Sequence, residues 1–189
     1  MYNPYVVMDW AWGAVAVVWA VSSFTSKRTA RRQSARSRLV QLGLAAFAAI
    51  LIAGIGPWET TLSRQIVPKS SVIANLGLAL TLAGIGFALW ARFALGRNWS
   101  GTVTIKRDHE LVRSGPYAIV RHPVYSGFLL ALLGTFVARG SLGALLGLGV
   151  ILLVLRLKSL TEESFMLEQF GSQYTAYQRE VKALVPFLW

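Results

Sequence analysis

Long apolar runs separated by short polar stretches dominate this chain of 189 residues. A helix needs about 20 mainly apolar residues to cross the hydrocarbon core of a membrane, because lipid offers no partners for backbone groups and each must be satisfied within the helix. Five runs meet or approach that length, at residues 6–24, 39–58, 72–95, 123–137 and 142–160. The pattern predicts an all-α integral membrane protein with about five transmembrane helices.

The last two apolar runs are separated by only four residues, 138–141. A connection this short predicts an antiparallel helical hairpin. The hairpin would bring the start of the fourth helix beside the end of the fifth. Residues 121–125 and 158–163 would then lie at the same end of the molecule, although they are far apart in the sequence.

The composition agrees with a membrane protein, since 54% of the residues are hydrophobic and 14% are charged, against roughly a quarter charged in an ordinary soluble domain. The length and the spans together predict one membrane domain over 1–189. No cleavable signal peptide is predicted, because the first apolar run lacks a basic leader and a small-residue cleavage site before the basic loop.

The distribution of Lys and Arg predicts how the helices are oriented, because cytoplasmic loops carry the excess of these residues. Sixteen of them fall on one side of the predicted spans, and only Arg64, Lys69 and Arg139 fall on the other. We therefore expect the N-terminus outside and the C-terminus inside. The basic loop at residues 27–38 could also be a nucleic-acid patch, but the topology rule already accounts for its charge.

Cysteine is absent, which excludes disulfides, thiolate metal sites and cysteine nucleophiles. The only imidazoles, His109 and His122, do not show the paired spacing of metal ligands, so we expect no bound metal. Small residues recur at helical spacing at Gly127, Ala131 and Gly134, and in the GxxxG step from Gly143 to Gly147. Such steps are typical of closely packed membrane helices.

Candidate chemistry gathers around the predicted start of the fourth helix. The Ser114-Gly115-Pro116 turn precedes Arg121-His122-Pro123, and proline is well tolerated at the first position of a helix. The unpaired N–H groups and positive dipole end of a helix start favour an anion, so Arg121 and His122 could contribute to a carboxylate or phosphate site. The alternatives are an arginine that reaches toward lipid headgroups and tyrosines of an interfacial aromatic belt.

At the end of the fifth helix, Lys158 and Glu162 share a face, with Glu163 alongside. The simplest interpretation is an exposed ion pair, worth only a few tenths of a kcal/mol. In a site, Glu162 could instead accept hydrogen bonds from a ligand, and Lys158 could hold an acidic group of the substrate.

Several ordered motifs cover about the C-terminal half of the chain. They are His109-Glu110-Leu111-Val112, Gly115-Pro116-Tyr117, Arg121-His122-Pro123-Val124-Tyr125-Ser126-Gly127, Glu162-Glu163, Phe170-Gly171-x-x-Tyr174-x-x-Tyr177 and Pro186-Phe187. In this order the motifs resemble the isoprenylcysteine carboxyl methyltransferase family, and related membrane phospholipid methyltransferases share part of the pattern.

The resemblance implies an integral membrane enzyme that transfers a methyl group from S-adenosylmethionine to the carboxylate of a lipid-modified cysteine, leaving S-adenosylhomocysteine. It also implies that residues 97–189 form the catalytic, cofactor-binding region, whereas the apolar runs place the first three transmembrane helices within residues 1–96. Carried over by motif, the cofactor-binding residues are His109, Glu110, Leu111, Val112, Tyr117, His122, Pro123, Val124, Tyr125, Glu162 and Glu163. The residues implied in catalysis are Arg121, Lys158 and Glu162.

Two points stay open in the sequence. Either Glu162 or Glu163 could contact the cofactor, because the hairpin length is ambiguous by one residue. Lys158 stands where many family members have an arginine; it keeps the charge but loses the bidentate fork that recognises a carboxylate.

The physics of the implied reaction suits a dry cleft. Methyl transfer from a sulfonium to a carboxylate cancels two opposite charges, so a low-dielectric site favours it, and an ionised acceptor needs no general base. The acceptor would be an amphiphilic lipid drawn from the bilayer, with membrane lipids as the other partners and no nucleic acid. The rival interpretations are a phospholipid or amine N-methyltransferase, and a transporter or scaffold without enzymatic activity.

Overall fold

The structure is a computed structural model that describes residues 2–24, 29–32, 34–96, 104–106 and 111–186. Its elements, in chain order, are α1 (Pro4–Phe24), β1 (Thr29–Arg32), α2 (Ala35–Ala53), α3 (Glu59–Leu62), α4 (Ser71–Leu95), β2 (Thr104–Lys106), η2 (Gly115–Ala118), α5 (Pro123–Arg139), α6 (Leu142–Phe170) and α7 (Ser172–Glu180). Nearly all of this is helical, as predicted. The all-α prediction missed the antiparallel pair β1–β2, whose strands of four and three residues are too short to show an alternating pattern.

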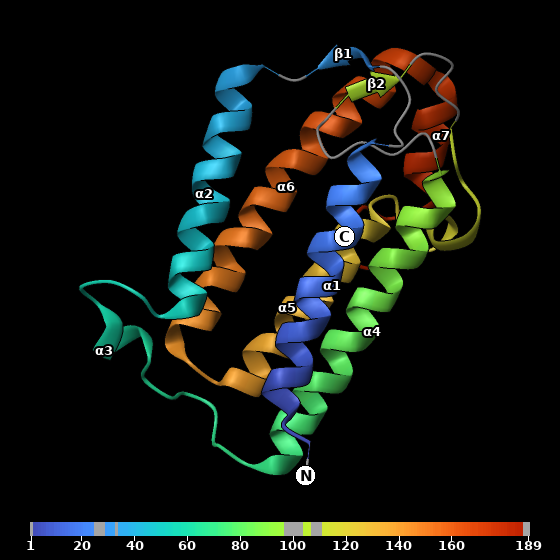
Figure 1. Cartoon of the computed structure of the whole chain (residues 1–189). Coiled ribbons are helices and arrows are strands. Elements are labelled where there is room, and N and C mark those ends of the chain that lie inside the picture. Colours follow the sequence, from blue (N-terminus) through green and yellow to red (C-terminus); the bar gives the residue numbers. More distant parts are fainter. Residues whose placement is uncertain (1, 25–28, 33, 97–103, 107–110, 187–189) are drawn as a thin grey trace.

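Among the described residues, four helices, α1, α2, α4 and α6, are long and apolar enough to cross a membrane. The chain is therefore an integral membrane protein. The fourth predicted span, α5, is an apolar helix of only 17 residues, about 26 Å at 1.5 Å per residue. Figure 1 shows it inside the bundle, between α4 and α6. The prediction of about five spans thus corresponds to four full-length helices and one shorter helix.

The second predicted helix, at residues 39–58, had both boundaries wrong. It begins at Ala35, because the hydroxyl of Ser34 accepts a hydrogen bond from the backbone N–H of Ser37 and caps the first turn. It ends at Ala53, because Gly54 adopts a left-handed conformation with φ of 65° and closes the helix. The apolar run continues past this glycine, which is why hydrophobicity alone placed the end too late.

The fifth predicted helix was too short. It was expected to end at residue 160, where the apolar run ends, but α6 continues to Phe170. The ten additional residues add about 15 Å of helix. Glu162 and Glu163 therefore lie on a rigid helix rather than in a flexible tail.

Glycines bring the backbones of α4 and α5 into contact. A Cβ atom at Gly84 would lie 2.3 Å from the backbone nitrogen of Ala131, and one at Gly77 would lie 2.5 Å from that of Ala138. Helix α6 approaches α2 in the same way, since a Cβ at Gly143 would lie 2.2 Å from the carbonyl oxygen of Leu51. The predicted small residues Gly127, Ala131, Gly134, Gly143 and Gly147 all lie at these close approaches, so the prediction that they serve packing is confirmed.

The tight hairpin predicted between the last two apolar runs is also confirmed. Helix α5 ends at Arg139, and Gly140, with φ of 64°, closes it before α6 begins at Leu142. The start of α5 consequently lies beside the far end of α6, at the end of the bundle that also holds α7 (Figure 1).

Candidate active site

The chain enters the candidate site through the short helix η2. Gly115 has φ of 60°, and Pro116 follows at the first helical position. Tyr117 is buried, and its hydroxyl donates to the backbone carbonyl of Ala91 on α4 at 3.4 Å. Burial raises the pKa of Tyr117, so its phenol stays neutral and serves as part of an apolar wall.

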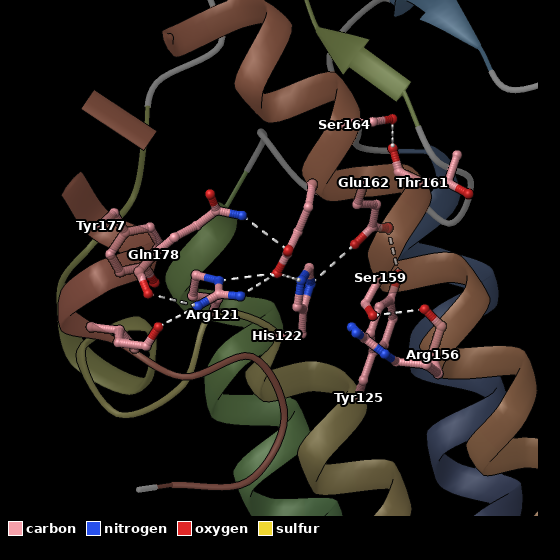
Figure 2. Close-up of polar contacts among 12 residues, drawn as sticks. Arg121, His122, Tyr125, Arg156, Ser159, Thr161, Glu162, Ser164, Tyr177 and Gln178 are labelled. Atoms are coloured by element: carbon pink, nitrogen blue, oxygen red, sulfur yellow. Dashed lines mark hydrogen bonds and ion pairs between the residues drawn. The ribbon is translucent and has the colours of Figure 1, made fainter. Parts of the chain in front are cut away.

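His122 stands at the N-cap of α5, immediately before Pro123, and its side chain makes no capping hydrogen bond. Its imidazole ring lies between two carboxylates of α6 instead (Figure 2). Nε2 is 3.1 Å from Oε1 of Glu163, and Nδ1 is 3.4 Å from Oε2 of Glu162. The two glutamates therefore contact opposite nitrogens of one ring.

Both oxygens of Glu163 are engaged by the protein itself. Oε1 accepts from Arg121, whose Nε lies at 3.0 Å and Nη2 at 2.6 Å, in addition to its contact with His122. Oε2 accepts from Nε2 of Gln178, on α7, at 3.0 Å. The Arg121 and Glu163 side chains are only 10% and 11% exposed, so this is a buried, charge-assisted network.

Glu162 has a more open environment, since 27% of its side chain is exposed. The hydroxyl of Tyr125 donates to its Oε1. The Tyr125 ring stacks on the His122 ring, with 5.5 Å between centroids and 7° between planes. Nζ of Lys158 lies 5.3 Å from the centroid of the Tyr125 ring. Glu162 is thus a carboxylate held in place by aromatic neighbours that still reaches the surface.

The two carboxylates determine the charge of His122. Burial by itself would lower the pKa of the imidazole, but the hydrogen bonds and charges of Glu162 and Glu163 outweigh it and raise the pKa. Because both ring nitrogens face acceptors, the geometry suits the protonated ring, which donates from both nitrogens.

The C-terminal segment packs against the loop that precedes α5. The backbone N–H groups of Arg121 and His122 donate to the carbonyl oxygens of Lys182 at 2.8 Å and Ala183 at 3.0 Å. Nη1 of Arg121 also donates to the carbonyl oxygens of Gln178, at 3.3 Å, and Val181. The segment after α7 therefore fixes both the backbone and the guanidinium of the loop before α5.

The structure brings most of the predicted site residues together. Tyr117, Arg121, His122, Tyr125, Lys158, Glu162 and Glu163 meet where α5 begins and α6 extends past its apolar part. Pro123 and Val124 are buried, and Val112 packs on the apolar cluster that contains Tyr117 and Tyr125. Leu111, which is half-buried, comes just before Val112. His109 and Glu110 lie outside the described residues.

Sequence reasoning missed Gln178, which contacts both Glu163 and Arg121. It lies directly after the Tyr174-x-x-Tyr177 motif, whose tyrosines are both buried. Burial raises the pKa of Tyr177 to about 12, and its hydroxyl donates to the backbone carbonyl of Tyr117. The helical spacing of the two tyrosines could have predicted that Gln178 lies on a helix that packs against the site. It could not have predicted which atoms Gln178 contacts.

The fold and the site define an integral membrane protein whose polar site is built where a helical hairpin and the C-terminal segment meet. Residues 72–173 match the model of the phospholipid methyltransferase family. This match covers just over half of the chain, and the protein belongs to that family.

Its curated relatives include protein-S-isoprenylcysteine O-methyltransferase B of Arabidopsis thaliana, 34% identical over 61% of this chain and 60% of the relative. The human protein-S-isoprenylcysteine O-methyltransferase is 30% identical over 72% of this chain and 51% of the relative. The chain thus spans half to three fifths of the length of these two relatives.

A solved structure of a eukaryotic intramembrane Ras methyltransferase, isoprenylcysteine carboxyl methyltransferase, superposes with a TM-score of 0.58 at 23% identity. The superposition covers 82% of this chain and 54% of that one. At this identity the likeness establishes the shared fold.

Proposed function

We propose that this protein is an S-adenosylmethionine-dependent membrane methyltransferase that O-methylates a carboxylate of a lipid-modified cysteine or of a similar amphiphilic acceptor. The observation that carries the proposal is the pair of adjacent glutamates in different environments. Both oxygens of Glu163 accept hydrogen bonds from the protein itself. The Glu162 side chain is fixed by Tyr125 and His122 and still reaches the surface. The curated relatives named as isoprenylcysteine O-methyltransferases support the acceptor class.

The donor set fits the amino-acid end of S-adenosylmethionine. The carboxylate of Glu162 suits an ammonium group, and the positive end of the α5 dipole beside His122 suits a carboxylate. When bound, the cofactor supplies an electrophilic sulfonium methyl group. The aromatic face of Tyr125 lies next to Glu162, where it can attract a cation through its ring quadrupole.

The apolar wall of the site suits the adenosine part of the cofactor. We assign this role to Leu111, Val112 and Tyr117, with Val124 packed in the same apolar cluster and Pro123 shaping the turn into α5. The backbone of His109 and Glu110 remains predicted to border the adenosine.

The two basic residues take different roles in the proposal. The guanidinium of Arg121 donates hydrogen bonds to Glu163 and to backbone carbonyl oxygens. We therefore assign Arg121 as a positioning residue that orients Glu163 and the C-terminal segment. Lys158 is half-buried on the same face of α6 as Glu162, and it is the residue we assign to the acceptor carboxylate. A lysine provides a point charge there rather than a bidentate fork.

A carboxylate acceptor suits the site better than an amine. An amine would have to lose a proton before attack, and His122 is the nearest basic side chain to Glu162. Both of its ring nitrogens already face carboxylates, and its pKa is raised, which makes it a poor base. An ionised carboxylate needs only positioning and exclusion of water.

The proposal includes an orientation. The excess of Lys and Arg supports an orientation with the site end of the bundle and the C-terminus in the cytoplasm and the N-terminus outside. The cofactor would then bind from the cytoplasm. The amphiphilic acceptor would enter laterally from the bilayer.

The test is methyl transfer from radiolabelled S-adenosylmethionine by the purified protein in lipid nanodiscs. A farnesylated cysteine derivative with a free carboxylate should become base-labile methyl ester, whereas phosphatidylethanolamine should gain no label. In Lys158→Met, the KM for the acceptor should rise about tenfold, from the loss of one charge-assisted contact, while cofactor affinity stays unchanged. Label on the amine lipid alone would overturn the carboxylate assignment.

A further inference from the structure

A second polar cavity lies at the opposite end of the bundle from the candidate active site. It has a volume of about 370 Å³ and is lined by polar side chains that include Ser63, Gln65, Lys69, Arg139 and Ser141. Arg139 is the last residue of α5, the helix whose first turn holds the active-site residues. We call this cavity, which is lined by residues from the ends of α2, α5 and α6, the end pocket.

The charged side chains that line the end pocket are basic, and the carboxylate of Asp9 pairs with one of them, Arg139. By the topology rule, this side of the membrane should carry few basic residues, and the sequence places only Arg64, Lys69 and Arg139 there. Two of these three line the same pocket, and none of the described residues that line it is Asp or Glu. Such a pocket favours an anion.

Arg139 keeps hydrogen-bonding capacity in this position. Its Nη2 donates to Oδ1 of Asp9 at 2.6 Å, which fixes one edge of the guanidinium. Its Nε is buried and has no hydrogen-bond partner within the described part of the chain. A buried donor without an acceptor is costly. Because this Nε is sealed from solvent, an anion in the pocket would contact the terminal guanidinium nitrogens of Arg139 instead.

The remaining lining indicates which kind of anion fits. Ile52, Ala53 and Leu62 line the pocket next to the polar residues. Ile52 and Ala53 belong to the last turn of α2, a helix apolar enough to cross a membrane, and Leu62 ends the short helix α3. Cations beside the apolar end of such a helix match a phosphate group that carries acyl chains.

We propose that the end pocket binds the phosphodiester headgroup of an anionic membrane phospholipid. Lys69 and Arg139 contact the phosphate oxygens, while Ser63, Gln65 and Ser141 offer hydrogen bonds to the rest of the headgroup. This site is separate from the proposed acceptor site and does not depend on methyl transfer.

The experiment measures lipid binding by native mass spectrometry of the full chain in mild detergent. Phosphatidylglycerol, phosphatidylcholine and inorganic phosphate are titrated separately. We expect saturable binding of phosphatidylglycerol, weakened at least tenfold in the double variant K69Q/R139Q. The matched control R64Q removes a neighbouring cation that does not line the pocket. The affinity of this variant for phosphatidylglycerol should equal that of the wild-type protein.

Two additional variants guard against a misfolded double variant. Asp9→Asn breaks the ion pair of Arg139 but keeps both cations, and it should retain the lipid. The single variant Lys69→Gln changes only an exposed residue and should weaken binding several-fold. Equal binding of phosphatidylcholine, unchanged binding by the double variant, or binding of inorganic phosphate without the lipid would each overturn the proposal.

Discussion

The inner and outer faces of the candidate site differ although adjacent residues of α6 form them. On the inner face, the Glu163 side chain is 11% exposed and receives hydrogen bonds from Arg121, His122 and Gln178. On the outer face, the Glu162 side chain is 27% exposed, receives a hydrogen bond from Tyr125 and lies 3.4 Å from Nδ1 of His122.

This difference shows how one helix can supply both the side chain that stabilises a site and the side chain that contacts the ligand. Successive residues of a helix point about 100° apart. Glu163 therefore faces the C-terminal segment, while Glu162 faces the surface of the protein. His122 contacts both glutamates, so the hydrogen bonds that fix Glu163 and His122 also fix the position of Glu162. Rigidity thus comes from Glu163, and ligand contact from Glu162.

The largest expected effect comes from breaking the inner face. Glu163→Gln leaves the Arg121 guanidinium buried without its charged partner, and breaking a buried pair in this way costs about 3 kcal/mol. Thermal unfolding of the detergent-purified protein should show a clearly lower midpoint. Glu162→Gln is the matched variant one residue away, and it should move the midpoint much less. Equal losses in the two variants would contradict the division between the faces.

The sequence predicted the two glutamates but could not assign them. The four-residue connection at 138–141 established that α5 and α6 form a hairpin, which brought His122 and Glu162 to one end. The assignment depends on the rotation of α6 about its axis, which is set by the contact of Gly143 with the backbone of α2. A packing detail of this kind has no signature in the local sequence.

The C-terminal segment was harder to predict than the hairpin. Its tyrosine motif indicated that it belongs to the site, but its bonds to Arg121 and His122 use backbone carbonyl oxygens. Any residue except proline offers the same backbone donor, and every residue offers the acceptor. For the same reason, the contribution of Gln178 could not be inferred without the position of α7.

A smaller effect is expected at Gln178. Gln178→Ala removes one donor to a buried carboxylate, worth about 1.5 kcal/mol. Gln173→Ala, on the exposed side of α7, is the control and should be neutral. Thermal midpoints of the two variants provide the comparison. If Gln173→Ala is as damaging as Gln178→Ala, the effect belongs to α7 as a helix and not to the contact with Glu163.

The smallest effect is a dependence of stability on pH. The folded state raises the pKa of His122, so its stabilising charge is fully present below the unfolded pKa of about 6.5 and is lost as the pH rises through the folded-state value. Midpoints measured between about pH 5.5 and 9 should fall across this window in the wild-type protein. The fall should be shallower in His122→Asn; an identical slope would remove His122 as its source.

The central claim is that Glu162, rather than Glu163, provides the contact to S-adenosylmethionine. The most direct measurement is isothermal titration calorimetry of S-adenosylmethionine into the purified protein and into Glu162→Gln, with Glu168→Gln, on the exposed continuation of α6, as the control. We predict binding on the order of micromolar, weakened at least about tenfold by loss of the charged contact in Glu162→Gln, and unchanged in the control. Absence of binding to the folded wild-type protein, or full affinity in Glu162→Gln, would contradict the account.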